Sequence, residues 1–220
     1  MSEATQTQTL EQTLNKTDLG HVIYENRKIF FSVIVAILIG AGGFVLWKQN
    51  RQSEALKNSV SVFNFQSKTW TETKAGKLPV SDLLKSFESL DKNVQSSPLM
   101  IPVGLEMAKF LFEKNSFAEA DAILSKLNTD HQVAAFFVNL QRSVILEKMG
   151  KNDEAIILLE KLAQQKEGLM PARVNLELGR LNLLKGEKGK AQTHFDFVIN
   201  NYPNDEHAKL AKLYLSQMAQ

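Results

Sequence analysis

The sequence predicts an all-α protein with a single N-terminal transmembrane helix, a helical stalk and a series of helix hairpins. Residues 29–47 read IFFSVIVAILIGAGGFVLW, an uncharged run long enough to cross a membrane as a helix. Small and large apolar residues then recur at offsets of 35 and 36 residues (108 to 143 to 179), as in stacked helical hairpins. A turn residue lies within each copy, so each copy reads as two helices.

Residues 1–28 form a polar tail. Residues 1–20 are rich in Ser, Thr, Gln and Glu, so we expect them to be disordered in isolation. The basic residues near the apolar run are balanced, because Lys16, Arg27 and Lys28 precede it and Lys48, Arg51 and Lys57 follow it. The positive-inside rule therefore leaves the orientation open.

Residues 29–47 are predicted to be an uncleaved membrane anchor. A buried core helix is one alternative, but such helices are rarely apolar on every face. A cleaved signal peptide is another, because Gly40-Ala41-Gly42-Gly43 resembles a small-residue cleavage site. The run continues through Phe44-Val45-Leu46-Trp47, however, and Trp47 stands where an interfacial aromatic residue belongs.

One face of this helix carries small residues: Ser32, Ala36, Gly40 and Gly43. Small side chains at this spacing allow a second membrane helix to approach closely. We therefore treat these four residues as a candidate helix-packing face.

Residues 48–97 are predicted to form a stalk and a degenerate leading repeat. The segment from Gln49 to about Thr73 has few helix breakers and should continue from the membrane helix. Residues 75–79, AGKLP, indicate a turn. Ser81-Asp82 is expected to cap the following helix, and residues 96–98, SSP, end the segment.

Residues 98–220 are predicted to contain three repeats and a closing helix. Corresponding positions in the three copies hold a small residue (Ala108, Ser143, Gly179), a turn residue (Asn115, Gly150, Gly186), an alanine (Ala120, Ala155, Ala191) and two large apolar residues (Leu124 and Leu127, Leu159 and Leu162, Phe195 and Val198). The small residue and the alanine allow two helices to approach closely, and the turn residue suits a left-handed backbone. Pro203 ends the last repeat, and residues 207–215 should form the closing helix.

Composition limits the chemistry. The sequence has no cysteine, which excludes disulfides, cysteine nucleophiles and thiolate metal sites. A formal charge of +2 without long basic blocks argues against nucleic acid as the main partner. The four histidines have no metal-ligand spacing, and no catalytic motif is present. We therefore expect a protein that is not an enzyme and uses no cofactor, metal or small-molecule substrate.

The repeat pattern resembles the tetratricopeptide repeat family, most closely in the third copy, which ends in Asn201-Tyr202-Pro203-Asn204. The first copy departs from the family pattern with Asn115 in place of glycine, and Asn175 occupies the family's tryptophan position in the third. In that family the first helix of each pair lines a concave, partner-binding face. The inward positions that the resemblance implies are Leu105, Lys109 and Phe112, then Phe137, Leu140, Val144 and Lys148, then Arg173, Leu176, Arg180 and Leu183. Some of these should be core residues between neighbouring repeats.

The whole chain, from the residues 24–28 motif YENRK through the Trp47-Lys48 exit to the repeats, resembles the YfgM-type ancillary subunits of the SecYEG translocon. The resemblance lies in the architecture more than in any single motif. It implies a cytoplasmic tail, repeats in the periplasm, and association with the bacterial inner membrane, the translocon and the membrane-anchored chaperone PpiD.

The sequence thus leads to one main functional hypothesis and two alternatives. The main hypothesis is a non-enzymatic adaptor that links the translocon to periplasmic chaperones for newly exported proteins. The first alternative is a scaffold that binds another envelope-assembly complex through its repeats, and the second is an enzyme or enzyme regulator with an unrecognised site.

Overall fold

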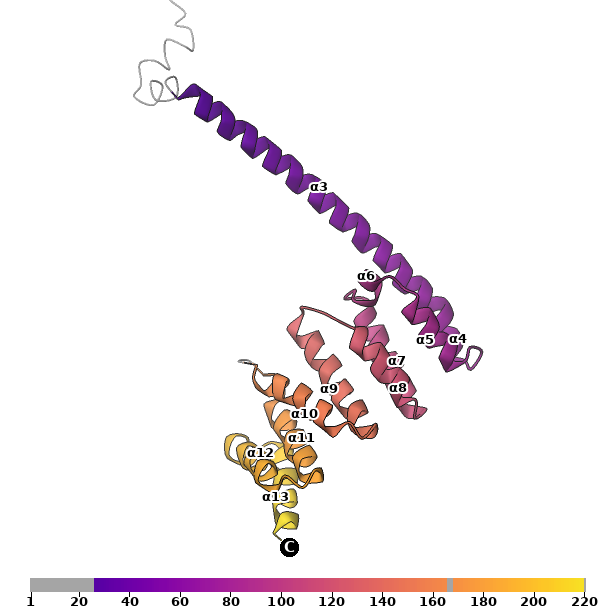
Figure 1. The fold of residues 1–220 in the computed structure, drawn as a ribbon, viewed down its shortest axis with the longest axis vertical. Coiled ribbons are helices and arrows are strands. Elements are labelled where there is room, and N and C mark those ends of the chain that lie inside the picture. Colours follow the sequence, from indigo (N-terminus) through magenta and orange to yellow (C-terminus); the bar gives the residue numbers. More distant parts are fainter. Residues whose placement is uncertain (1–25, 166–167, 220) are drawn as a thin grey trace, which may run out of the picture. The chain divides into compact units, whose positions relative to one another are not determined.

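The computed structural model describes residues 26–165 and 168–219, and in these ranges the chain is helical without any strand. Figure 1 shows the succession of helices along the chain. In chain order they are α3 (Arg27–Phe65), the π-helix η1 (Gln66–Trp70), α4 (Thr71–Lys74), α5 (Val80–Glu88), α6 (Lys92–Gln95), α7 (Met100–Glu113), α8 (Phe117–Lys126), α9 (Gln132–Lys148), α10 (Asn152–Ala163), α11 (Pro171–Leu184), α12 (Lys188–Asn201) and α13 (Glu206–Met218). The chain divides into two compact units, with the boundary between Leu56 and Lys57.

In the first unit, α3 is long and apolar enough to cross a membrane, and it is the one such helix among the described residues. Every side chain from Phe31 to Asn50 is exposed, so no protein core covers this apolar surface. The guanidinium of Arg51 lies 4.6 Å from the ring centroid of Trp47, an arrangement typical of a cation–π contact.

The predicted helical continuation beyond residue 48 is confirmed, since α3 runs to Phe65 and passes through η1 into α4. In the second unit, Val62 and Phe65 turn towards the core and are buried. The π-helical turn brings Trp70 fully inside. Its indole N–H donates a hydrogen bond to Oε2 of Glu106, over 3.2 Å, and its ring meets Phe110 edge-on at 5.3 Å. The sequence pattern did not predict this π-turn.

The chain reverses between α4 and α5 to form the leading hairpin, in which α5 packs on η1. Gly76 between them has a φ of +71°, a left-handed conformation that glycine adopts at little cost. The second helix begins at Val80 with Pro79 at its N-cap position, so the expected cap at Ser81-Asp82 is wrong and these residues lie in the first turn. The side chain of Gln95 is buried and donates hydrogen bonds to the carbonyl oxygens of Phe87 and Leu90 (both 3.0 Å). These bonds provide partners for backbone carbonyl groups at the C-terminal end of α5.

Three further hairpins follow: α7 with α8, α9 with α10, and α11 with α12. Their turns share one geometry. Asn115, Gly150 and Gly186 have φ values of +59°, +74° and +81°, as the spacing predicted for them. In each turn the next residue's N–H bonds to a carbonyl five residues back, a C-terminal capping arrangement that ends the first helix of the pair.

The recurring small residues lie at the predicted close contacts. Ala120, Ala155 and Ala191 are completely buried, as are Ala108 and, nearly so, Ser143. A Cβ atom added to Gly179 would lie 2.5 Å from Cε1 of Phe195, so only glycine fits beneath this ring without movement. In the third hairpin the ring of Phe195 on α12 therefore packs directly on the backbone of α11, as the repeat pattern predicted.

The core of the second unit consists of three clusters, each of which joins neighbouring hairpins. The first cluster runs from Val62 to Ile145 and links the leading hairpin, α7, α8 and α9. The second extends from Phe136 to Leu181 across α9, α10 and α11. The third joins α11 and α12 to the closing helix α13, whose Tyr214 stacks on Phe195 with 5.2 Å between ring centroids. No single hairpin buries its apolar face alone.

Candidate partner-binding groove

A groove of about 330 Å³ opens on the surface of the second unit, and we call it the α9 groove. Its size lies at the lower end of the range for binding pockets, roughly 300–1,000 Å³. Helix α9 supplies most of it, and α7 and α11 each contribute a wall. The lining residues are Leu105, Lys109, Phe112, Phe137, Leu140, Gln141, Val144, Ile145 and Arg173.

The floor of the α9 groove is apolar. Leu140 and Ile145 are buried and belong to the protein core, so they provide a fixed base. Phe137 is 46% exposed although it is a large apolar residue. Its ring meets the buried ring of Phe136 edge-on at 5.4 Å, which holds it in place. The structure thus presents an aromatic side chain to solvent on a rigid support.

Three polar side chains border this floor. The side-chain amide of Gln141 donates a hydrogen bond to the carbonyl oxygen of Leu105 (3.2 Å) and so ties α9 to α7. Lys109 on α7 is exposed, and Arg173 on α11 is half-buried. Among the residues that the structure describes, neither cation forms an ion pair. The groove therefore combines an apolar base with two cations that have no carboxylate partner in the described part of the chain.

Six of the predicted partner-binding residues meet in this groove: Lys109, Phe112, Phe137, Leu140, Val144 and Arg173. Leu105 also lines it, whereas Leu176 and Leu183 pack in the third core cluster. Lys148 is exposed at the end of α9 and lies outside the groove. The sequence pattern missed Gln141 and Ile145, although both stand on α9 beside predicted inward positions.

Arg180 also lies outside the groove, in an ion-pair cluster. Its guanidinium donates to both carboxylate oxygens of Glu147 on α9, over 2.6 and 2.5 Å. It also bonds to Glu177 one turn earlier on α11 (2.9 Å). The pKa of Glu147 lies below its ordinary value, mainly because Arg180 donates hydrogen bonds to the carboxylate. Arg180 therefore bridges α9 and α11 and does not line the groove.

The candidate helix-packing face in the first unit is open. Ser32, Ala36, Gly40 and Gly43 lie on one side of α3 by helical spacing. The hydroxyl of Ser32 donates to the carbonyl oxygen of Lys28 (2.8 Å), so its polar group is satisfied within the helix. A Cβ atom added at Gly40 or Gly43 would meet no atom within 4 Å. Nothing in the described part of the chain covers this face.

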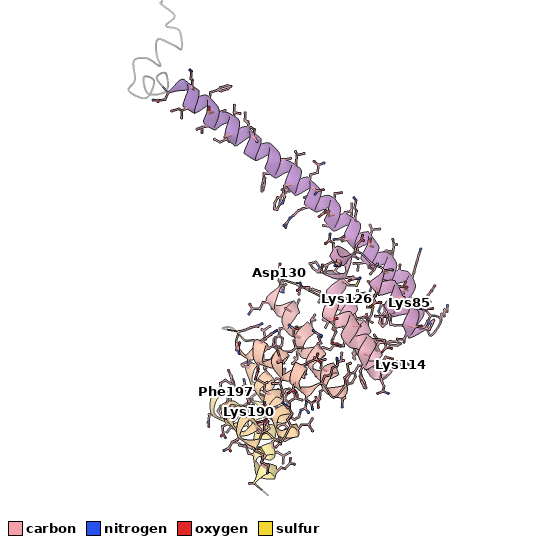
Figure 2. The ribbon with its side chains drawn as sticks, in the orientation of Figure 1. Lys85, Lys114, Lys126, Asp130, Lys190 and Phe197 are labelled. Carbon is pink, nitrogen blue, oxygen red and sulfur yellow. The ribbon has the colours of Figure 1, made fainter. Side chains whose placement is uncertain are left out.

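Outside the groove, several charged side chains of the second unit pair with charges on neighbouring helices. Figure 2 shows Lys126 at the end of α8, where its ammonium lies 3.5 Å from the carboxylate of Glu88. Arg142 on α9 pairs with Asp121 on α8 (2.5 Å), and Lys74 on α4 pairs with Glu106 on α7 (3.0 Å). In the described ranges, no three histidine or acidic side chains lie close enough to hold a metal ion.

Comparison with known proteins gives no assignment: no protein-family model matches the chain, and no curated protein matches it.

Proposed function

We propose that this protein is a membrane-anchored, non-enzymatic adaptor that binds polypeptide through the α9 groove. The observation that carries the proposal is that six of the predicted inward residues line one groove with an exposed aromatic side chain. Exposed aromatic residues on a rigid apolar base concentrate binding energy in protein interfaces. Extended or helical segments of a partner are the ligands that such grooves accept.

We further propose that the hairpins form a tetratricopeptide-like solenoid. The proposal is supported by the equivalent left-handed turns at Asn115, Gly150 and Gly186, and by the buried alanines five residues after them. It is also supported by core clusters that join each hairpin to the next, because repeat arrays are stabilised by contacts between neighbouring units.

Within this proposal, the protein is an ancillary subunit at the SecYEG translocon of the bacterial inner membrane. It links the translocon and the membrane-anchored chaperone PpiD to newly exported proteins, with the tail in the cytoplasm and the hairpins in the periplasm. This part rests on the resemblance of the architecture to the YfgM-type family, together with a helix long and apolar enough to serve as an anchor. The small-residue face of α3 is proposed as the contact for a neighbouring membrane helix.

Photo-crosslinking in intact membranes tests the proposal. A photoreactive phenylalanine analogue replaces Phe137 in the full-length chain, and crosslinked proteins are identified by mass spectrometry. Translocon subunits or PpiD should be captured through the groove. A matched control carries the same analogue at Lys190 on α12, a helix that contributes no residue to the groove (Figure 2).

Each result has a defined meaning. Capture of an outer-membrane or division complex in place of the translocon would support the scaffold alternative. If Phe137 captures nothing beyond what the Lys190 position captures, the α9 groove is not the binding surface and the proposal is wrong.

A further inference from the structure

The two cations of the α9 groove differ from the basic side chains that bridge neighbouring helices, and they differ from the unpaired lysines elsewhere on the surface because they border an exposed apolar floor. Arg142, Arg180 and Lys74 each pair with a carboxylate of a neighbouring helix, at 2.5, 2.5 and 3.0 Å. Lys109 and Arg173 line the groove and form no ion pair in the described ranges 26–165 and 168–219. The protein thus leaves unpaired the two cations that border its exposed apolar floor.

The positions of these cations constrain the ligand. Lys109 belongs to α7 and Arg173 to α11, and α9 supplies the floor between them (Figure 1). Packed helices have axes about 8–10 Å apart, so the axes of α7 and α11 on the two sides of α9 are separated by at most roughly 16–20 Å. An extended segment rises about 3.3 Å per residue, and five or six residues therefore reach from one wall to the other.

The chemistry of the ligand follows from desolvation. A segment that places an apolar side chain on Phe137 also removes water from the neighbouring cations. Removing water from a charge is unfavourable unless an opposite charge replaces it. A carboxylate on each side of the apolar anchor meets this requirement, and a basic segment does not.

We propose that the α9 groove recognises polypeptide segments in which one or two large apolar side chains are flanked on both sides by carboxylates. This inference rests on the proposed function and adds the class of segment that is bound. The apolar side chains pack against Phe112, Phe137 and Val144, and the carboxylates face Lys109 and Arg173. The proposed occupant is an internal segment, because the two cations come from different helices, and a peptide with a free C-terminal carboxylate tests whether they converge on one terminal group instead.

A peptide-binding measurement tests the inference. The full-length chain is placed in nanodiscs of uncharged phosphatidylcholine, and binding is followed by fluorescence anisotropy. The probe is the labelled, amidated peptide Gly-Glu-Glu-Ser-Leu-Phe-Ser-Glu-Glu-Gly. Comparison peptides carry lysine at every glutamate, serine in place of Leu-Phe, or a free C-terminal carboxylate.

The acidic probe should bind at least about tenfold more tightly than the lysine peptide, and added salt should reduce the difference. The peptide with serine in place of Leu-Phe should not bind. The peptide with a free C-terminal carboxylate should bind with nearly the same affinity as the amidated probe. The double variant K109E/R173E should reverse the preference and bind the lysine peptide better. K161E, an exposed change on α10 outside the groove, should leave both affinities unchanged.

The reversed preference separates a charge effect from unfolding, since an unfolded variant binds neither peptide selectively. Equal affinity for the acidic and lysine peptides would overturn the inference, as would a requirement for the free carboxylate. If the analogue at position 137 still crosslinks to a partner in that case, the proposed function stands. Only the inferred preference for acidic flanking residues is then wrong. If Phe137 captures no partner, the proposed function itself is wrong.

Discussion

Arg180 illustrates how one side chain can look like a binding residue in the sequence and have another role in the structure. Its position in the third repeat is equivalent to inward-facing positions, so the pattern assigned it to the partner surface. In the structure it is held by Glu147, which lies 33 residues earlier in the chain. Such a contact depends on how two hairpins pack, which local periodicity does not encode. The residue is better interpreted as a link between α9 and α11.

Replacement of Arg180 by glutamine should lower the free energy of unfolding by about 1–2 kcal/mol. A charge-assisted hydrogen bond contributes somewhat more than this when buried, but the pair is partly exposed and water screens it. The urea midpoint of the full-length protein in detergent measures the change. A double-mutant cycle with E147Q should show a coupling energy of the same sign, and additive effects would contradict the bridge.

The same pair should make stability depend on pH. The pKa of Glu147 lies below its ordinary value of 4.5 in the folded protein, so folding favours the charged carboxylate. The stabilisation is fully present above pH 4.5 and is lost as the pH falls through the lower pKa of the folded state. The stability difference between the wild-type protein and R180Q should therefore shrink in acid. A difference that stays constant would mean that the pair does not supply it.

At the scale of the helices, the sequence pattern predicted the hairpins well and their irregularities poorly. Turn residues and buried alanines have local steric causes, so the positions of Gly150 and Ala155 follow from spacing alone. The π-turn before Trp70 and the short helix α6 were not predicted. Trp70 is held by contacts with Glu106 and Phe110, which lie more than 30 residues away in the sequence. The residues next to Trp70 therefore do not predict where it packs. The groove was predicted in outline because its α9 residues share one helix face. The role of Arg180 was not predicted, because its partner Glu147 lies on another helix.

Two nearby glycines should respond in opposite ways to alanine. Gly186 has a φ of +81°, where an added Cβ is strained, so G186A should cost about 1 kcal/mol. Gly189 lies in the first turn of α12 with ordinary φ and nothing within 4 Å of an added Cβ. G189A should therefore stabilise the protein by roughly 0.5 kcal/mol. Thermal unfolding of both variants followed by circular dichroism makes the comparison, and equal shifts of the same sign would be inconsistent with the turn geometry.

Replacement of Ala155 by phenylalanine should destabilise the hairpin of α9 and α10. Ala155 is completely buried in the second core cluster, and a ring at this point exceeds the available space. Overpacking of this kind typically costs about 1–3 kcal/mol. The urea midpoint of the full-length protein should fall, while I157F, a control at a half-exposed site on the same helix, should change little. An unchanged midpoint for A155F would show that the repeat assignment is wrong.

At the scale of the whole molecule, an apolar helix precedes a unit made of helix hairpins. In the proposed function, the apolar part of α3 is surrounded by lipid, and the surface of the hairpins is surrounded by water. Charge does not decide which side of the membrane the hairpins occupy, because basic residues flank the apolar run on both sides. The orientation therefore needs a direct measurement.

Alkaline phosphatase fused to the C-terminus should be active, since this enzyme folds only after export to the periplasm. A fusion of a cytoplasmic fluorescent protein at the same place should give little signal. A truncated chain that ends at Asn50 and carries the same reporters serves as a control for the anchor alone. Activity of the cytoplasmic reporter with silent phosphatase would reverse the proposed topology.

The order of the three core clusters bears on how the second unit forms during synthesis. The first cluster is complete once Met149 has emerged, the second once Leu181 has emerged, and the third once Met218 has emerged. Each core can therefore close before the next is complete, and the first two cores do not need the C-terminus. Contacts between sequence neighbours also favour rapid folding. A chain of this design is suited to fold progressively from its N-terminal side while the rest is still being made.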